Sequence, residues 1–583
     1  MQAEPVEVGA SLQAAGTPLH VDTAHPVLRL ALVLPARVPT WLARFVRSAR
    51  RRSWLAVTVV QAGDAPRGRA PRVPTDLRAY LAFERLRRWR SGRGMTRKLP
   101  TVAGHYLRYS VGSFLVLVAG FVSFPILTRL LDNTQYGILG YVDTWIGLAL
   151  GIAKLGAQHS ILRYYPHRAE AGVMERFATN LVMLPAAASL LLWIAAALVL
   201  AVATRFVPDA FPPVFWFALL TIPLGVGTSF SEMVLRAREQ STLTVTLRVI
   251  WRWLELALIL GAVVLVAHTA LAVYGGRLAA AALMLAAYAA LVWRQLPFRR
   301  DAIAAAPFLE SLRYGFPLLV SELAGIVLVS IDRVMLKSMT GDYADVGVYT
   351  IGYALALTVS TFLNATLYEA FNPVANRIYE TEGALALGAL KDRVLLPMVY
   401  CSFAIAAGLW GAGADALLAL SGPDKAASAP VFVMIGINYA LFPLLDLGGY
   451  GLLLQKRSLL ILMLTVTAAL LNVALNLVLI PRFGVMGAVY ATFVSYAALG
   501  IAHCVACPRH LLRLPDLRAT LTALGLALLL VGVARGTDLF GIVSHWGRMG
   551  AMVVLGLVLY AGPALLLDPR LRAFVRFGRA AAA

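Results

Sequence analysis

Three ionisable residues lie on one face of a strongly apolar stretch, residues 243–267. Arg248, Arg252 and Glu255 fall within a sector of about 60° when plotted at roughly 100° per residue of α-helix. Arg252 lies ~13 Å along this helix, too deep for its guanidinium to reach water easily. A buried guanidinium that faces a cavity suits a diphosphate, because its paired N–H groups match two oxygens. The alternative is an internal ion pair of Arg252 with Glu255 or with an acid of another helix.

Three further basic residues border or enter apolar stretches. Lys154 and Arg163 flank the end of the second stretch, where long basic side chains usually extend to lipid head groups. Arg277 lies in the outer third of the sixth stretch, where that explanation is weaker. With the three residues above, Lys154 and Arg277 complete the candidates for contact with an anionic substrate.

Six carboxylates also lie within apolar stretches. They are Asp143, Glu232, Glu322, Asp332, Glu369 and Asp446. An ionisable side chain in a membrane span costs roughly 2.5–3.5 kcal/mol, so such residues indicate a polar cavity or a functional role. Each could be an ion-pair partner, a gate between two halves of the protein, or a site for a coupling proton or sodium ion. Ion pairing is the favoured interpretation for any one of them, but hardly for all six.

The elements that position these residues must be transmembrane helices. Hydrophobic residues make up 60% of the chain and charged residues only 14%, with a mean hydropathy of +0.74, which excludes a soluble globular protein of this length. The formal net charge is +22, but the Lys and Arg residues cluster between apolar stretches, as they do in cytoplasmic loops. We therefore expect no nucleic-acid partner. Three cysteines imply no disulfide framework, and no motif indicates a metal or a cofactor.

The sequence predicts about 14 transmembrane helices. They cover approximately residues 106–128, 138–156, 178–203, 213–235, 243–267, 270–292, 316–338, 346–371, 391–413, 430–453, 458–480, 485–506, 519–535 and 548–567. If the N-terminus is cytoplasmic, the basic residues of the cytoplasmic loops outnumber those of the opposite side by about threefold. This asymmetry predicts that both termini are cytoplasmic.

An internal duplication indicates two lobes. Tyr136-Gly-Ile-Leu-Gly-Tyr141, at the start of the second span, is similar to Val346-Gly-Val-Tyr349, at the start of the eighth. The offset predicts two six-helix lobes, residues 95–300 and 301–515, followed by two additional helices and a basic tail in residues 516–583. Because six spans return a chain to its starting side, the lobes are related by a pseudo-two-fold axis along the membrane normal, and substrate should bind between them.

Residues 1–94 differ from the rest, being rich in Arg, Pro and Ala. Their apolar runs, such as Leu28–Leu34, are too short to span a bilayer. We expect a disordered extension, or an appended segment that precedes a natural start at Met95. The alternative is a pair of basic amphipathic helices, Trp41–Gln61 and Asp76–Trp89, on an anionic membrane surface.

Several motifs resemble those of polysaccharide-unit flippases. These are Tyr314-Gly-Phe-Pro317, Ser330-Ile-Asp-Arg333, Gly347-Val-Tyr349, Asn476-Leu-Val-Leu-Ile-Pro-Arg-Phe-Gly484 and Arg129-Leu-Leu-Asp-Asn-Thr-Gln-Tyr-Gly137. The chain is similar to the O-antigen and exopolysaccharide flippases of the multidrug/oligosaccharidyl-lipid/polysaccharide (MOP) exporter superfamily. The resemblance implies a transporter of the bacterial cytoplasmic membrane that moves undecaprenyl-diphosphate-linked glycan units by alternating access. Its partners would be this lipid-linked oligosaccharide, membrane lipids, a coupling ion and other glycan-assembly proteins.

Three alternatives remain open at this point. A cation-coupled drug exporter and a peptidoglycan lipid-precursor flippase share the fold, although a cationic drug would favour acids in the cavity over the arginines of residues 243–267. A membrane polymerase or ligase of glycans is the enzyme alternative. No phosphate-cradling loop or nucleophile motif occurs, and every predicted outside loop is short, which favours transport over catalysis.

Overall fold

The computed structural model describes residues 19–22, 28–34, 55–61, 112–166, 172–206, 213–536 and 541–582. Within these ranges, the side chains of residues 362, 364–370, 536 and 576–582 are not described. The chain divides into two units, Met1–Leu99 and Pro100–Ala583. Each unit is described by itself below.

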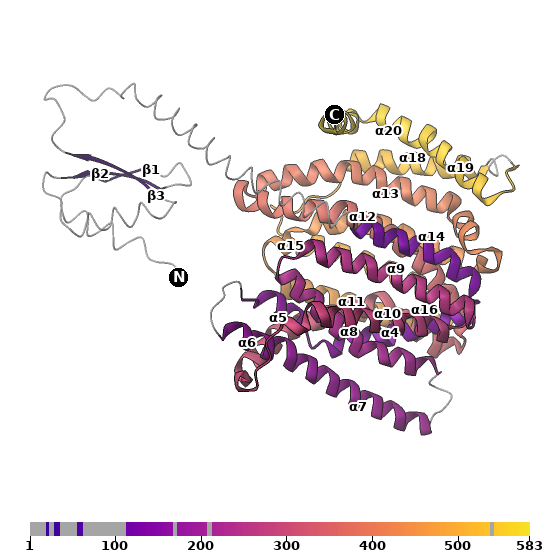
Figure 1. The fold of residues 1–583 in the computed structure, drawn as a ribbon. Helices are drawn as coiled ribbons and strands as arrows, with labels where there is room; N and C mark the ends of the chain where they lie inside the picture. Colours follow the sequence, from indigo (N-terminus) through magenta and orange to yellow (C-terminus); the bar gives the residue numbers. More distant parts are fainter. Residues whose placement is uncertain are drawn as a thin grey trace. The chain divides into compact units, whose positions relative to one another are not determined.

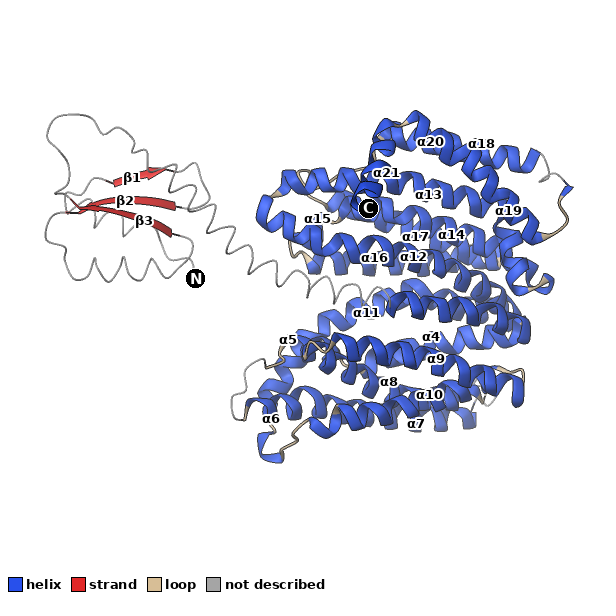
Figure 2. Ribbon diagram, turned by 45° about the horizontal axis from the view of Figure 1, so that its top comes forward, coloured by secondary structure: helices blue, strands red, loops and turns tan. Residues whose placement is uncertain are grey.

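The first unit contains a three-stranded sheet (Figure 2). Strand β2 (Leu28–Leu34) pairs antiparallel with β1 (Leu19–Asp22) and parallel with β3 (Leu55–Gln61). Strands β2 and β3 are rich in Leu and Val, which suit a pleated surface. Strand β3 contradicts the alternative of a helix over Trp41–Gln61. The remaining residues of 1–94 lie outside the described residues, so the prediction of a disordered or appended segment stays a prediction.

The second unit is a bundle of long helices that run side by side (Figure 1). Those of the N-lobe, residues 112–291, are the helix Gly112–Leu130, α4 (Asn133–Ala153), α5 (Ala157–Arg163), α6 (Val173–Phe177), the π-helical turn η1 (Ala178–Met183), α7 (Leu184–Phe206), α8 (Val214–Ala237), α9 (Ser241–Leu265) and α10 (Ala270–Leu291). The turns η3 (Trp293–Gln295) and η4 (Arg300–Ala302) lead to the next lobe.

The C-lobe covers residues 305–506. Its helices are α11 (Ala305–Thr340), α12 (Tyr343–Glu382), α13 (Ala384–Ser421), the turn η5 (Pro423–Ser428), α14 (Ala429–Gly449), α15 (Gly451–Leu454), α16 (Ser458–Phe483) and α17 (Val485–Ala506). The chain ends with α18 (Leu517–Gly536), α19 (His545–Leu555), the π-helical turn η7 (Gly556–Ala561), α20 (Gly562–Leu567) and α21 (Pro569–Ala582).

Twelve helices of the described residues are long and apolar enough to cross a membrane. The predicted count of 14 also includes α9 and α12, which do not meet that criterion, so the exact number stays a prediction. Helix α9 carries the three ionisable residues noted above within its 25 residues. The all-helical membrane fold agrees with the prediction, whereas the division into two six-helix lobes at residues 95–300 and 301–515 stays a prediction.

Helix α7 shows that the surface of this unit is in contact with lipid. Most of its large apolar side chains face outward, with Leu191 68%, Val199 69% and Phe206 80% exposed. In water this exposed apolar surface would remain hydrated, which is energetically unfavourable. The sequence therefore places α7 in contact with lipid, at one edge of the bundle (Figure 2).

The two lobes meet through glycines at the start of α4 and α12. A Cβ atom on Gly137 would overlap the carbonyl oxygen of Tyr343, and one on Gly347 would overlap that of Asn133. The two contacts are equivalent, because each glycine faces the residue four positions before the other. This is the pseudo-two-fold relation that the duplication at Gly137 and Gly347 predicts.

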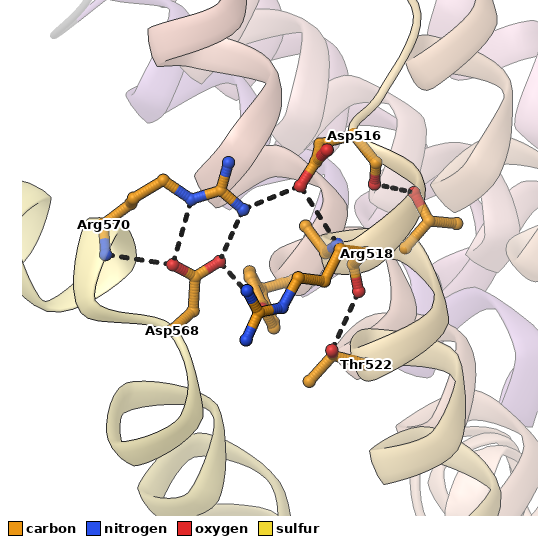
Figure 3. A network of polar contacts seen from close by, with 8 residues as sticks. Asp516, Arg518, Thr522, Asp568 and Arg570 are labelled. Carbon is orange, nitrogen blue, oxygen red and sulfur yellow. Dashed lines mark hydrogen bonds and ion pairs between the residues drawn. The ribbon is translucent and has the colours of Figure 1, made fainter.

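A polar network joins the segment before α18 to the start of α21 (Figure 3). Asp568 accepts a hydrogen bond from the backbone N–H of Arg570 and caps α21, and Tyr400 of α13 donates to the same carboxylate. The Arg570 guanidinium also donates to Asp516, 2.7 Å away, just before α18. That hydrogen bond holds the pKa of Asp516 below its ordinary value.

Candidate functional site

A cavity of about 1160 Å³ lies between the two lobes. Its walls come from the helix Gly112–Leu130, α4, α9 and α10 of the N-lobe and from α11 and α12 of the C-lobe. Its charged lining residues are Arg248, Arg252, Arg277, Arg333, Asp143 and Glu255. Arginines thus outnumber carboxylates in the lining by two to one, which makes the cavity cationic.

Helix α9 brings its three ionisable residues to this cavity, as their spacing predicts. The Arg252 Nη1 lies 2.9 Å from Oε2 of Glu255 on the same helix face. Both side chains stay partly exposed, at 37% and 21% respectively. Both sequence interpretations of Arg252 therefore hold geometrically, since it faces the cavity and also forms an internal ion pair.

Arg248 pairs with a carboxylate of another helix. Glu232 of α8 accepts from Arg248 and also from Arg236, whose Nη2 lies 2.6 Å away. This carboxylate, predicted as a gating or coupling candidate, is thus shared between two guanidinium groups. The cluster of Arg236, Glu232 and Arg248 keeps one excess positive charge near the cavity wall.

Arg277 of α10 reaches across the N-lobe to Asp143 of α4. Its Nη1 lies 2.5 Å from Oδ1 of Asp143, and the hydroxyl of Tyr274 donates to the same oxygen. The guanidinium carbon lies 5.0 Å from the centre of the Tyr274 ring. The structure thus brings a substrate candidate and a gating candidate together in one ion pair on the cavity wall.

Arg333 of α11 is a lining residue that the sequence analysis did not single out as a substrate candidate. Its guanidinium carbon lies 4.7 Å from the ring centre of Tyr353 and 5.6 Å from that of Tyr349. The side chain donates to the carbonyl of Val329, one turn earlier, at 3.1 Å. The signal that could have found it is its place in a long apolar helix, next to a second ionisable residue.

Asp332 precedes Arg333 but is fully buried in the C-lobe. It accepts hydrogen bonds from the hydroxyls of Tyr349 and Thr492, at 2.5 and 2.9 Å, and from the amide of Asn476. Beside it, Oδ1 of Asn476 and Nδ2 of Asn472 are buried without hydrogen-bond partners among the described residues. A buried carboxylate with an unpaired amide oxygen beside it is a candidate site for a proton or a small cation.

The predicted candidates Lys154 and Glu322 lie outside the cavity lining and pair with each other. Lys154, at the end of α4, donates to Glu322 of α11, and Gln158 donates to the same carboxylate at 2.7 Å. The two lobes also touch here at Gly156, which has φ +70°, and Gly315. A Cβ atom on either glycine would collide with the backbone of the other. This pair therefore closes one end of the interface between the lobes.

The remaining candidates lie away from the cavity. Asp446 of α14 lies 3.0 Å from Nδ1 of His503 on α17, within the C-lobe. Arg163 lies over the ring of Tyr314 at 4.6 Å, beside the contact of Gly156 with Gly315. The side chain of Glu369 lies outside the described residues. None of these three residues has an observed place in the cavity wall.

The sequence and the fold both have known relatives. Residues 106–378 match the family model described as polysaccharide biosynthesis protein. The structure of the lipid II flippase MurJ, in an inward closed conformation, is similar with a TM-score of 0.63 and 10% sequence identity, over 79% of this chain and 99% of that one. An inward-facing MATE multidrug transporter of the MOP superfamily matches with a TM-score of 0.48 and 13% identity, over 73% of this chain and 96% of that one. No curated protein sequence matches the chain.

The family match agrees with the resemblance carried by the sequence motifs. The family match covers the N-lobe and the first two helices of the C-lobe, which together form the whole cavity wall. The likeness to MurJ shows that the fold extends through both lobes. The chain is therefore a multi-pass membrane protein that shares the fold of MurJ, and its residues 106–378 match the polysaccharide biosynthesis protein family.

Proposed function

We propose that this protein moves undecaprenyl-diphosphate-linked glycan units from the inner to the outer leaflet of the bacterial cytoplasmic membrane. The observation that carries the proposal is the arginine-rich cavity between the lobes, in a chain of the polysaccharide biosynthesis family. Each phosphate of the diphosphate linkage keeps an ionised oxygen, so its transfer through hydrocarbon alone would be prohibitive. A cationic cavity lowers this barrier while the polyprenyl chain remains in lipid.

Alternating access would come from movement of the two lobes about the cavity. Contacts between the lobes lie at both ends of α4, at Gly137 and Gly347 and at Lys154 and Glu322. In the proposed orientation, with both termini cytoplasmic, the end at Lys154 faces the cytoplasm. Breaking the contacts at that end would open the cavity to substrate, and breaking those at Gly347 would release it outside.

Asp332 is our candidate for the coupling site. Its burial and its three hydrogen bonds support a role for a proton or a sodium ion, because binding of either would remove a buried negative charge. The paired carboxylates Asp143, Glu232, Glu322 and Asp446 already have basic partners. They are more suited to hold helices together or to act as gates.

Reconstituted transport tests this function. Full-length protein in proteoliposomes would receive fluorescent undecaprenyl-diphosphate oligosaccharide, and an impermeant quencher would measure its movement between leaflets. We expect faster movement than in protein-free liposomes, and faster movement than for a labelled phosphatidylglycerol. Equal rates with and without protein would contradict the proposal.

Two alternatives make different predictions in the same assay. The fold likeness to MurJ favours a peptidoglycan precursor, which would be moved at least as fast as the surface glycan unit. A drug exporter would move cationic dyes and leave both lipids unmoved. The excess of arginines over acids in the cavity disfavours a cationic substrate, since like charges repel in a poorly solvated site.

A further inference from the structure

The four arginines that line the cavity differ in whether a carboxylate neutralises them. Three are paired: Arg252 with Glu255, Arg277 with Asp143 and Arg248 with Glu232. Arg333 forms no ion pair with any carboxylate whose side chain the structure describes; its contacts there are with Val329, Tyr349 and Tyr353. Its guanidinium therefore faces the cavity without a carboxylate in direct contact among the described side chains.

The neighbouring carboxylate of Asp332 does not neutralise this charge by direct contact. Consecutive side chains on a helix project about 100° apart, so residues 332 and 333 face different surroundings. Asp332 is engaged by Tyr349, Asn476 and Thr492 inside the C-lobe. Arg333 instead lines the cavity.

The side chain of Arg333 is also held in position by the residues packed around it. It is only 9% exposed, and two tyrosine rings lie beneath its guanidinium. Aromatic faces stabilise a cation and fix its plane, but they supply no counter-charge. A guanidinium has five N–H donors, and the described residues accept only one hydrogen bond from it, at Val329. The remaining donors suit the paired oxygens of a phosphate.

We infer that Arg333, held by Tyr349 and Tyr353, is the residue that binds the anionic head group in this cavity. The ligand chemistry is a diphosphate ester, and this identification of the ligand rests on the proposed function. The paired arginines, Arg252 among them, serve mainly to position helices and to keep the cavity hydrated. The cluster of Arg236, Glu232 and Arg248 has the only other excess charge along the described wall and provides a weaker secondary contact.

Ligand binding by the full-length protein tests this assignment. Native mass spectrometry in detergent would measure Kd for undecaprenyl diphosphate, inorganic pyrophosphate and phosphatidylglycerol. We expect Arg333→Ala to weaken binding of undecaprenyl diphosphate by at least about tenfold, and Arg333→Lys to weaken it less, because Lys keeps the charge without the fork. Arg333→Gln removes the charge but keeps a polar side chain with N–H donors, so it reports loss of charge if the alanine variant does not fold. Lys337→Ala, one turn further along α11 and outside the cavity lining, should bind like the wild type.

A second variant tests whether the ion pair with Glu255 prevents Arg252 from binding the anionic ligand. Glu255→Gln removes the carboxylate that neutralises Arg252, while it preserves the shape of the side chain. We expect several-fold tighter binding of undecaprenyl diphosphate, because a second unneutralised guanidinium then faces the cavity. Weaker binding would mean that the ion pair itself forms part of the ligand site, which would overturn the division between paired and unpaired arginines.

The outcomes separate the inference from the proposed function. Wild-type affinity for undecaprenyl diphosphate in both Arg333→Ala and Arg333→Gln would overturn the role of Arg333 and leave the flippase proposal intact. Binding of pyrophosphate that depends on Arg333, without binding of undecaprenyl diphosphate, would support the anion site and contradict the proposed substrate. If the wild type binds none of the three anions, both are wrong.

Discussion

Gly137 and Gly347 occupy equivalent positions in the two lobes, and each lies against the backbone of the other lobe's helix. Gly137 faces the carbonyl of Tyr343, and Gly347 faces that of Asn133. Helices can approach this closely only where no Cβ intervenes. The contact joins the starts of α4 and α12, so it holds the lobes together at one end of the cavity.

Gly347→Ala should therefore shift the lobes apart at this end. The added methyl group has no space against Asn133, and the neighbouring atoms are backbone, which cannot rotate away. Spin labels at the exposed residues Thr134 and Asp342 would measure the separation by electron–electron double resonance. Gly325→Ala on α11 is the matched control, because a Cβ there meets nothing within 4 Å. An unchanged distance distribution in Gly347→Ala would show that the contact does not restrain the lobes.

At the opposite end of α4, the contact between the lobes depends on the ion pair of Lys154 with Glu322. Glu322→Gln should weaken closure there, because it removes the partner of Lys154, whose side chain is 14% exposed. We expect an effect of about 1–3 kcal/mol on the open and closed populations, between the values for exposed and buried pairs. Spin labels at Leu162 and Leu309, both exposed, would detect longer distances. The exchanged pair Lys154→Glu with Glu322→Lys should recover the closed distance; failure to do so would assign the effect of Glu322 to its hydrogen bond with Gln158.

The predicted topology can be checked with single cysteines. Asp342 precedes α12 and Thr381 lies near its other end, so the two positions should face opposite sides of the membrane. In a background without Cys401, Cys504 and Cys507, cysteines at Asp342 and at Asp424 should react with an impermeant maleimide in intact cells. A cysteine at Thr381 should react only after permeabilisation. Labelling of Thr381 in intact cells would reverse the proposed orientation.

The sequence predicted those features that repeat with the period of a helix or of the duplication. The shared face of Arg248, Arg252 and Glu255 follows from helical geometry, and the equivalence of Gly137 and Gly347 follows from the repeat. Pairings between distant helices could not be predicted in the same way. Asp143 and Arg277 are 134 positions apart, and no local pattern specifies which of several buried acids an arginine will meet.

The unpaired state of Arg333 could not be predicted from the sequence either. Its type and its apolar surroundings are visible in Ser330-Ile-Asp-Arg333, but the sequence does not show whether the adjacent Asp332 neutralises it. Only the packing of α16 and α17 against α11 draws Asp332 into the C-lobe, through Asn476 and Thr492. The distinction between a neutralised and an unneutralised arginine is therefore a tertiary property.

Tyr349 connects the buried carboxylate with the cavity. Its hydroxyl donates to Asp332 at 2.5 Å, while its ring lies beneath the guanidinium of Arg333. Protonation of Asp332, or binding of a cation there, would change what this hydroxyl bonds to, so the ion site and the cavity are connected through this residue. Tyr353 makes a useful comparison, because its ring also lies beneath Arg333 but its hydroxyl bonds Tyr439 instead.

Tyr349→Phe should therefore separate head-group binding from ion coupling. The ring remains, so we expect Kd for undecaprenyl diphosphate to stay within about twofold of the wild type, since aromatic contact with Arg333 is preserved. The bond to Asp332 is lost, so the response of transport to pH or sodium should flatten, as it should in Asp332→Asn. Tyr353→Phe should keep the wild-type ion response. Transport rates in proteoliposomes across a range of pH and sodium concentrations give the measurement. If Tyr349→Phe retained the full ion response, the coupling would have to reach the cavity by another path from Asp332, through Asn476 or Thr492.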